Sequence, residues 1–321
     1  GFGFYPTAAS QNYQNYLVQV DGRLDIREDF YATGLVAVRR ATEALGTPNT
    51  EFATAPTVVD TIPVEFSLYQ RFNRFFYRAT VAGTRYWYYD NSIIAVGGLP
   101  AASRDRIEYE ERVRLGYELS EDVSLWVQPS LQQRVYDIFI NAAGQARDST
   151  GWGVNLGATV SVGKKSKLEG FIGYQTLSYI ADGSSTPATV FGLSGSWNGY
   201  EPLTIRPSIS RTINESAYSS YQNYVSTTVG VDFSYIIHDA WTAVGGTSIN
   251  AADYNPAAGV ANVSARTDYF WKASVGLLYS FRPQLSIGPL YEHTTGWTTD
   301  PNSGGPQYSR DQISIRLVAR R

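Results

Sequence analysis

The sequence predicts an all-β protein, an antiparallel up-and-down transmembrane β-barrel with about 16 strands visible. Three observations predict it. Apolar and polar side chains alternate over long runs, tight turns alternate strictly with longer loops, and tyrosine is abundant. Because successive side chains of a strand point to opposite faces, a period of two gives each strand one apolar and one polar face. A barrel in a bilayer needs an apolar outer face and tolerates charge on its inner face.

The composition of the 321-residue chain limits the class of protein. Apolar residues make up 43% and charged residues 17%, so the chain can bury enough apolar surface to fold. It holds 24 Tyr against 14 Phe and 7 Trp, an excess of amphipathic rings that is typical of membrane interfaces. The absence of Cys excludes disulfides and thiolate metal sites. A net charge of -3 gives no basic surface for nucleic acid, and no segment of about 18 apolar residues indicates a transmembrane helix.

Strand-like runs of roughly 10 to 15 residues follow one another from residue 13 onward, longer than the usual strand of about 5 to 6 residues. In the run 106–120, apolar and aromatic side chains occupy most odd positions, whereas acids and arginines occupy most even ones. The runs 124–136 and 151–163 alternate in the same way. Glu111 and Arg85 break the alternation. A charge that faces lipid near the midplane costs roughly 2 to 4 kcal/mol for Arg and less for Glu, so we expect both residues toward a rim.

The connections between the runs fall into two kinds. Tight turns are expected at 27–29, 72–74, 120–122, 164–166, 198–200, 238–239 and 282–284. Longer loops are expected at about 41–59, 90–104, 139–150, 181–187, 213–222, 251–265 and 298–308. This sorting predicts that the turns share the periplasmic rim and the loops share the extracellular rim. Bacterial barrels generally have an even number of strands, and about 15 complete spans are visible, so the N-terminal stub 1–6 should be a strand as well.

Five segments carry a resemblance to a known family: 12–34, 104–130, 165–179, 202–213 and 308–320. Their order of hairpins resembles the Putative beta-barrel porin 2 family of outer-membrane proteins over nearly the whole chain. In that family another hairpin precedes the point where this chain begins, and the last residue is usually aromatic, whereas this chain ends in Arg320 and Arg321. The resemblance therefore implies one barrel domain over residues 1–321 that lacks its N-terminal part, with 18 strands in the complete protein.

For function, the resemblance implies an integral outer-membrane protein of Gram-negative bacteria that acts as a pore or export conduit, with polysaccharide as the cargo, because members are often associated with exopolysaccharide systems. The implied partners are outer-membrane lipid and lipopolysaccharide, a polysaccharide chain and periplasmic export proteins, in a homo- or hetero-oligomer. A general diffusion porin remains open as an alternative. So does a non-conducting structural barrel that scaffolds an outer-membrane assembly, since one fold hosts many functions.

The candidate functional residues are those on the polar side of their strands, which we expect to face the lumen. They are Asp21, Arg23, Asp25, Arg78, Glu108, Glu110, Arg112, Arg114, Glu118, Trp126, Gln128, Arg134, Tyr136, Arg206 and Arg316. One hypothesis is a mixed-charge channel with Tyr and Trp platforms on which sugar rings stack. The other is that any water-filled barrel needs polar side chains on its wall, which simply pair with one another.

Catalysis and cofactor binding have little support in the sequence, so we expect no enzyme, no cofactor and no metal. The chain has two histidines, of which His238 lies in a tight turn, and His293 would need a partner such as Asp300 or Asp311. The loop acids, such as Asp253, are not spaced like the oxygen ligands of a calcium loop. The glycines of 151–157 read as small strand residues, because no helix follows them to form a phosphate site.

Overall fold

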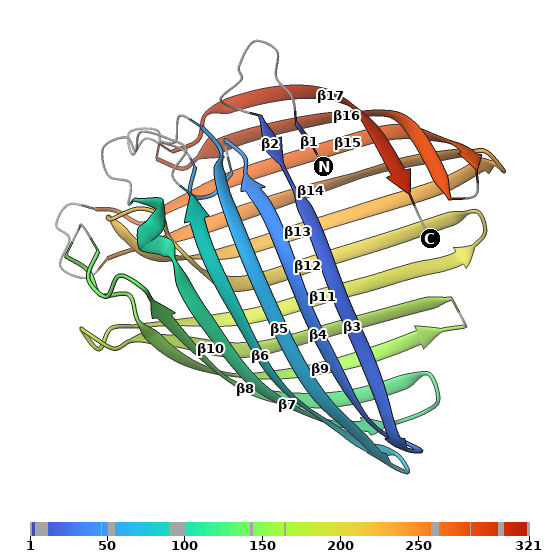
Figure 1. The fold of residues 1–321 in the computed structure, drawn as a ribbon, viewed down its shortest axis with the longest axis horizontal. Coiled ribbons are helices and arrows are strands. Elements are labelled where there is room, and N and C mark those ends of the chain that lie inside the picture. Colours follow the sequence, from blue (N-terminus) through green and yellow to red (C-terminus); the bar gives the residue numbers. More distant parts are fainter. Residues whose placement is uncertain are drawn as a thin grey trace.

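The computed structural model describes residues 2–3, 12–45, 47–50, 55–89, 100–141, 144–163, 165–257, 263–282, 284–300 and 305–319. Fifteen of its strands form one antiparallel sheet in which each strand pairs with its neighbours in the sequence (Figure 1). The predicted all-β, up-and-down arrangement is confirmed. Among the described residues, no helix is long and apolar enough to cross a membrane.

The sheet contains β3 (Tyr16–Arg27), β4 (Phe30–Glu43), β5 (Thr57–Phe72), β6 (Phe75–Tyr89), β7 (Arg106–Glu118), β8 (Val123–Tyr136), β9 (Ser149–Val162), β10 (Ser166–Tyr179), β11 (Ser185–Tyr200), β12 (Leu203–Glu215), β13 (Tyr221–His238), β14 (Trp241–Pro256), β15 (Arg266–Arg282), β16 (Leu285–Thr298) and β17 (Tyr308–Ala319). A separate pair is formed by β1 (Phe2–Gly3) and β2 (Tyr13–Gln14). A short 3-10 helix, η2 (Ala101–Arg104), precedes β7. The strand expected in the stub 1–6 is thus described at Phe2–Gly3, and the rest of the stub lies outside the described residues.

The connections sort to the two ends of the sheet as the sequence predicts. Asn73 lies in the tight turn between β5 and β6, whereas Asp253 lies near the opposite end, where β14 approaches its loop. Asp29 and Asn73 take positive φ angles in their turns, a conformation that Asp and Asn tolerate better than most side chains. Three boundaries differ from expectation. The turn expected at 198–200 lies at 201–202, the loop expected at 213–222 shrinks to 216–220, and the loop expected from residue 251 begins after Pro256. The reason is that β11, β12, β13 and β14 are longer than predicted.

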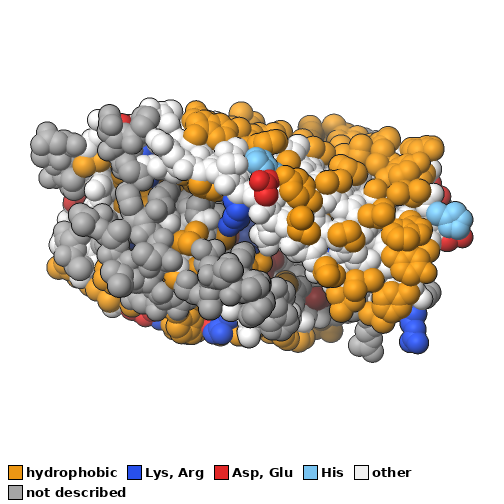
Figure 2. Space-filling model, turned by 90° about the horizontal axis from the view of Figure 1, so that it is seen from above, with side chains coloured by type: hydrophobic (Ala, Val, Ile, Leu, Met, Phe, Trp, Pro, Cys, Tyr) orange, Lys and Arg blue, Asp and Glu red, His pale blue; other side chains and the backbone are white. Residues whose placement is uncertain are grey.

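The two faces of the sheet differ in chemistry. On β7, Tyr109, Val113 and Leu115 are exposed on one face, and Figure 2 shows hydrophobic side chains gathered over much of the outer surface seen from above. The opposite face is the inner one, because its side chains contact strands that are not neighbours in the sheet. Arg114 of β7, for example, reaches Glu169 of β10. An apolar outer face and a polar inner face suit a barrel in lipid.

The two charges that break the alternation have different positions. Arg85 lies near the loop end of β6 and forms an ion pair with Asp137, which follows β8, so it is near a rim as expected. Glu111 is not: it lies in the middle of β7, opposite Val81 on β6 and Leu131 on β8. Its carboxylate is exposed on the apolar outer face. The register of β7 explains this placement. Glu111 could reach a rim only if the whole strand slid along its neighbours, and every other charged residue of β7 would then be displaced as well.

The first and last strands of the main sheet are both edges, since no ladder joins β3 to β17 among the described residues. Figure 1 shows the sheet curled, with β3 and β4 passing in front of β12 to β14. On β17, Ile313 and Ile315 are 80% and 79% exposed. Since the sheet has fifteen antiparallel strands, β3 and β17 run in the same direction.

Candidate functional site

A row of ion-paired side chains crosses the inner wall from β5 to β10. Arg112 donates to Glu65 and to Glu110, at 2.6 Å each. Arg114 donates to both oxygens of Glu169, at 3.0 and 3.1 Å. These are charge-assisted hydrogen bonds, which fix the direction of long side chains. The charged positions of β7 therefore form an ordered ladder on the inner wall.

Arg114 can span β8 and β9 because β9 carries small residues on its inner face. The row that crosses the wall at this height alternates aromatic residues with glycines: Phe76, Gly116, Trp126, Gly157, Phe171 and Gly192. A Cβ atom at Gly157 would overlap the ring of Trp126, which lies flat across the glycine. Glycine in a strand interior often marks such a close approach. The glycines of β9 thus make room for rings and for the reach of Arg114.

Two of the predicted sugar platforms present no open ring face. Trp126 is 5% exposed, with the guanidinium carbon of Arg114 lying 3.8 Å from the centre of its ring. Tyr136 is also buried and donates to Glu215 at 3.4 Å. The rings of Tyr31, Tyr69 and Phe171 are only half-buried. Contact with a ligand would therefore fall to these rings and to the arginines rather than to Trp126.

The structure brings seven of the fifteen predicted lumen residues into three groups. In the first, Glu108 accepts from Arg106 at 2.8 Å and lies 3.4 Å from Arg134. In the second, Arg112 joins Glu110 and Glu65. In the third, Arg114 joins Gln128, Trp126 and Glu169.

The remaining predicted residues lie apart from these groups. On β3, Arg23 pairs with Asp25 at 2.6 Å, and Asp21 accepts from Gln19. Glu118 lies 3.5 Å from Arg71 near the turn end. Arg78 donates to the hydroxyl of Tyr31 at 3.3 Å. Arg206 stands opposite Asp232 in the ladder of β12 and β13, and Arg316 stands opposite Gly288 in that of β16 and β17.

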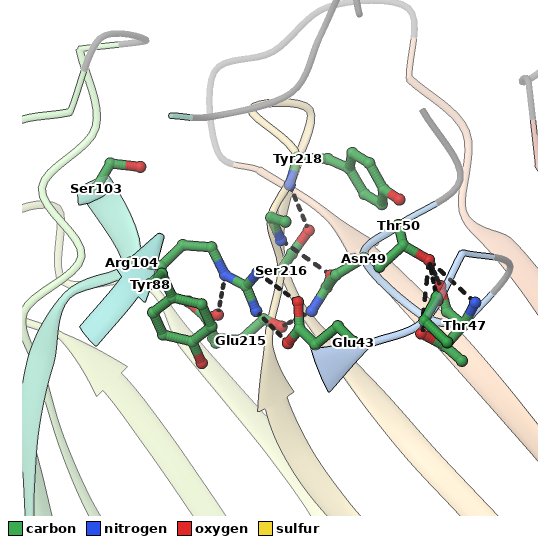
Figure 3. A network of polar contacts seen from close by, with 12 residues as sticks. Glu43, Thr47, Asn49, Thr50, Tyr88, Ser103, Arg104, Glu215, Ser216 and Tyr218 are labelled. Carbon is green, nitrogen blue, oxygen red and sulfur yellow. Dashed lines mark hydrogen bonds and ion pairs between the residues drawn. The ribbon is translucent and has the colours of Figure 1, made fainter. Parts of the chain in front are cut away.

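A second polar site lies at the loop end, where Figure 3 shows Arg104 between Glu43 and Glu215. Arg104 of η2 donates to both oxygens of Glu43 at 2.8 Å and to Glu215 at 2.6 Å. Arg104 is 3% and Glu215 is 6% exposed. Three segments far apart in the sequence, the ends of β4 and β12 and the helix η2, are therefore joined by one buried guanidinium.

The charges around Arg104 affect its protonation. Burial alone would lower the pKa of Arg104, but the carboxylates of Glu215 and Glu43 outweigh it and raise the pKa above its ordinary value. Burial raises the pKa of the neighbouring Asp105, although its carboxylate accepts from the backbone N–H of Tyr88 at 2.7 Å. Arg104 is therefore charged at neutral pH.

Glu215 belongs to the tip of the hairpin formed by β12 and β13. In this hairpin tip (residues 212–224), β12 separates from β11, whereas β13 stays paired with β14. The ladder between β11 and β12 ends at Phe191 and Arg211, whereas β12 and β13 stay paired as far as Glu215 and Asn223. The amide of Asn223 donates to the Tyr179 hydroxyl at 2.8 Å, on the inner face of β10. The hairpin tip therefore packs into the interior at the loop end.

Side chains from other loop-end segments hold this hairpin tip. Asn49 accepts from the backbone N–H of Ala217 at 2.9 Å and donates to the carbonyl of Glu215 at 3.2 Å. Arg147 bonds the carbonyl of Ser216, and Gln145 donates to that of Ser219 at 2.8 Å. Polar backbone groups buried in this way need such partners. The hairpin tip is fixed by connections that follow β4 and β8.

Sequence reasoning missed this loop-end site. Arg104, Glu43 and Glu215 were assigned to loops because their neighbours are Pro, Ala, Ser and Asn, so parity could not place them. Glu65 and Glu169 could have been found, since both lie on the polar side of strands that the alternation identifies. One suggested catalytic pair does meet: His293 and Asp311 are 2.7 Å apart. Both side chains lie on the exposed outer face, where Tyr291 of β16 and Ile313 of β17 also lie.

Two cavities open on the inner wall, of about 320 and 330 Å³. The first lies under the hairpin tip and is lined by Glu108, Gln132, Arg134, Gln175, Arg211 and Ile213, among others. The second lies nearer the turns and is lined by Arg78, Arg112, Arg114, Gln128, Asn155 and Phe171, among others. Cavities of this size, with a few convergent polar groups, are typical of small-molecule sites.

Comparison with known proteins agrees with the fold. The chain has a TM-score of 0.52 and 11% identity with the apoprotein form of the FrpB iron transporter of Neisseria meningitidis (F5-1 variant), covering 95% of this chain and 56% of that one. The F3-3 variant gives 0.51 and 12%, with the same coverage. At these identities the likeness shows the fold alone, and this chain spans little more than half of those transporters. No curated protein matches the chain.

The family that matches in sequence is described as Putative beta-barrel porin 2, and it matches residues 1–321. The features found in the structure agree with such a family: long antiparallel strands, an apolar outer face and a charged inner wall. The chain belongs to this porin family and is a β-barrel of the bacterial outer membrane.

Proposed function

We propose that this barrel is a conduit for polysaccharide across the outer membrane, without covalent chemistry. The observation that carries the proposal is the inner wall of β5 to β10, where paired charges, amide side chains and the half-buried ring of Phe171 line two cavities. Amides and charged groups hydrogen-bond sugar hydroxyls, and aromatic rings pack against the apolar face of a sugar ring. Barrels of about 16 to 18 strands are wide enough for an aqueous channel.

The partners follow from the two surfaces of the barrel. The apolar outer face would contact lipid and lipopolysaccharide, and periplasmic export proteins would dock at the rim of tight turns, whether the barrel works as a homo- or a hetero-oligomer. Glu111 lies exposed on the outer face, where lipid would accommodate its anionic form poorly.

A general diffusion porin is the second candidate, and one observation favours it. The hairpin tip lies inside the loop end and narrows it, held by Asn49, Arg147 and the Arg104 ion pairs. An inward segment of this kind would limit the pore to small solutes. The hairpin tip would then be a fixed constriction instead of a part that moves aside for a chain.

Reconstitution separates these functions. Purified barrel is inserted into planar bilayers, and ion conductance is measured before and after polysaccharide is added on one side. A conduit for polysaccharide conducts ions and is blocked transiently by chains that enter. A diffusion porin conducts but passes only small sugars into liposomes and shows no chain-length-dependent block. A folded barrel without any conductance would contradict both pore functions and leave the scaffold.

A further inference from the structure

We propose that the cavity near the turns binds an acidic sugar unit, with Arg78 holding its carboxylate. This inference rests on the proposed function and deepens it, because it names the chemical class of the polysaccharide. The cavity measures about 330 Å³ and lies on the inner faces of β5 to β10. Its lining includes three arginines, Arg78, Arg112 and Arg114, and two glutamates, Glu65 and Glu110.

Arg78 is the first reason. Its neighbours Arg112 and Arg114 are tied to carboxylates at 2.6 and 3.0 Å. Among the described residues, by contrast, no ion pair joins Arg78 to an acid, and its guanidinium contacts the Tyr31 hydroxyl at 3.3 Å and the Tyr69 ring at 5.6 Å. The side chain is exposed to the interior. Arg78 therefore has free donors that point to a ligand acceptor.

The second reason is the neighbour of Arg78. Arg78 and Arg114 stand directly opposite each other in the ladder of β6 and β7. Like charges that face each other across two strands repel; Glu169 offsets the charge of Arg114, and a bound anion would offset that of Arg78. Arg114 also donates to Gln128 at 2.9 Å, which keeps its guanidinium over the cavity. A carboxylate suits this place because guanidinium binds it through two parallel hydrogen bonds.

The rest of the lining favours a sugar over a bare inorganic anion. Gln128 and Asn155 supply amides that both donate and accept, as hydroxyl groups of a sugar require. Phe171 lines the same cavity with a half-buried ring, against which the apolar face of a sugar ring can pack. A neutral sugar would use the amides and the ring but leave Arg78 without an anionic partner. The occupant that uses all of these groups is a uronic acid unit.

The test compares two oligosaccharides of equal length on the full chain refolded in detergent. Binding of tetragalacturonate and of maltotetraose is measured by titration calorimetry at low and at high salt. We expect tetragalacturonate to bind more tightly than maltotetraose by at least about tenfold at low salt, because one charge-assisted pair contributes on that scale. We expect the difference to shrink at high salt, since an exposed pair is screened.

Two matched variants locate the site. Arg78→Gln should weaken tetragalacturonate binding at least about tenfold and leave maltotetraose binding unchanged. Arg282→Gln removes the same charge from the turn end of β15, outside the lining of this cavity, and should leave both affinities unchanged. The difference in gel migration between unheated and heated protein is measured for each variant. A difference equal to that of the native barrel shows that the variant is folded. Equal loss in both variants, or equal affinity for the two oligosaccharides, would overturn the proposal.

The same preparations separate this inference from the proposed function. If the barrel conducts ions and is blocked by a neutral polysaccharide, yet tetragalacturonate binds no better than maltotetraose, the conduit stands and the acidic-sugar site is wrong. If tetragalacturonate binds through Arg78 but the barrel never conducts, the site stands and the conduit is wrong. Failure of the conduit function and failure of the acidic-sugar site are therefore detected by different measurements.

Discussion

Glu215 is the residue on which the loop end depends. Its carboxylate lies 2.6 Å from Arg104, 3.5 Å from Arg106 and 3.6 Å from Arg147, and all four side chains are buried. Removing one partner of a buried charge pair leaves the others desolvated without compensation, which costs more than the pair contributes when intact. A single carboxylate balances several guanidinium groups here, so it is harder to replace than any one of the arginines.

We therefore expect Glu215→Gln to lower the free energy of unfolding by about 3 to 5 kcal/mol. The comparison is Glu110→Gln, whose partner Arg112 keeps Glu65 and lies in the wetter part of the wall, where a change of about 1 kcal/mol or less is expected. Urea titration of the refolded barrel in detergent micelles measures both. Equal losses in the two variants would show that burial does not matter at Glu215.

Gly157 is a second residue whose role depends on one contact. A Cβ there would overlap the Trp126 ring, whereas Gly22 on β3 has nothing within 4 Å of its Cβ position. Gly157→Val should therefore destabilise the barrel by about 1 to 3 kcal/mol through overpacking, and Gly22→Val should be neutral or stabilising. The urea midpoint measures the effect. Trp126→Ala added to Gly157→Val should recover part of the loss, and no recovery would contradict the contact.

At the scale of elements, alternation predicted the strands because a period of two is set by the bilayer on one side and water on the other. It predicted the polar side of β7 and β8 for the same reason. It could not predict the hairpin tip, because β12 and β13 keep their alternation after the ladder to β11 ends. The hairpin tip is held inward by contacts with Tyr179, Asn49 and Arg147. Alternation within a single strand cannot predict such contacts, because they join segments that are far apart in the sequence.

The hairpin tip gives a prediction at this scale. Asn49→Ala and Arg147→Ala together remove side chains that hold its backbone. We expect larger single-channel conductance with more frequent fluctuations, because the hairpin tip is held less tightly while the Arg104–Glu215 ion pair and the ladder of β12 and β13 remain. Recordings in planar bilayers measure this, with Asn198→Ala at the opposite rim as the control. Unchanged conductance in the double variant would show that the hairpin tip does not narrow the path for ions.

At the scale of the whole molecule, the inner wall mixes acids and bases, and most of them are paired. The pairs of β5 to β10 cancel locally, as in Glu65–Arg112–Glu110 and Arg114–Glu169. Paired charges impose little net field on a channel, whereas the removal of one sign leaves the other uncompensated within a low-dielectric wall that focuses its field. Selectivity should thus be weak in the native barrel and easily biased.

Small ions should therefore pass the native barrel with little preference between anions and cations. Arg112→Gln with Arg114→Gln should shift the reversal potential in a salt gradient toward cations, since Glu65, Glu110 and Glu169 then lose their partners. We choose Gln as the substitution at Arg112 and Arg114 instead of Glu. Two additional carboxylates beside Glu65, Glu110 and Glu169 would repel these acids and destabilise this part of the barrel. The matched control is Lys at both positions, which keeps the charge and should leave the reversal potential near that of the native barrel. If the Lys variant shifts as far as the Gln variant, the geometry of the guanidinium groups, and not their charge, sets the selectivity.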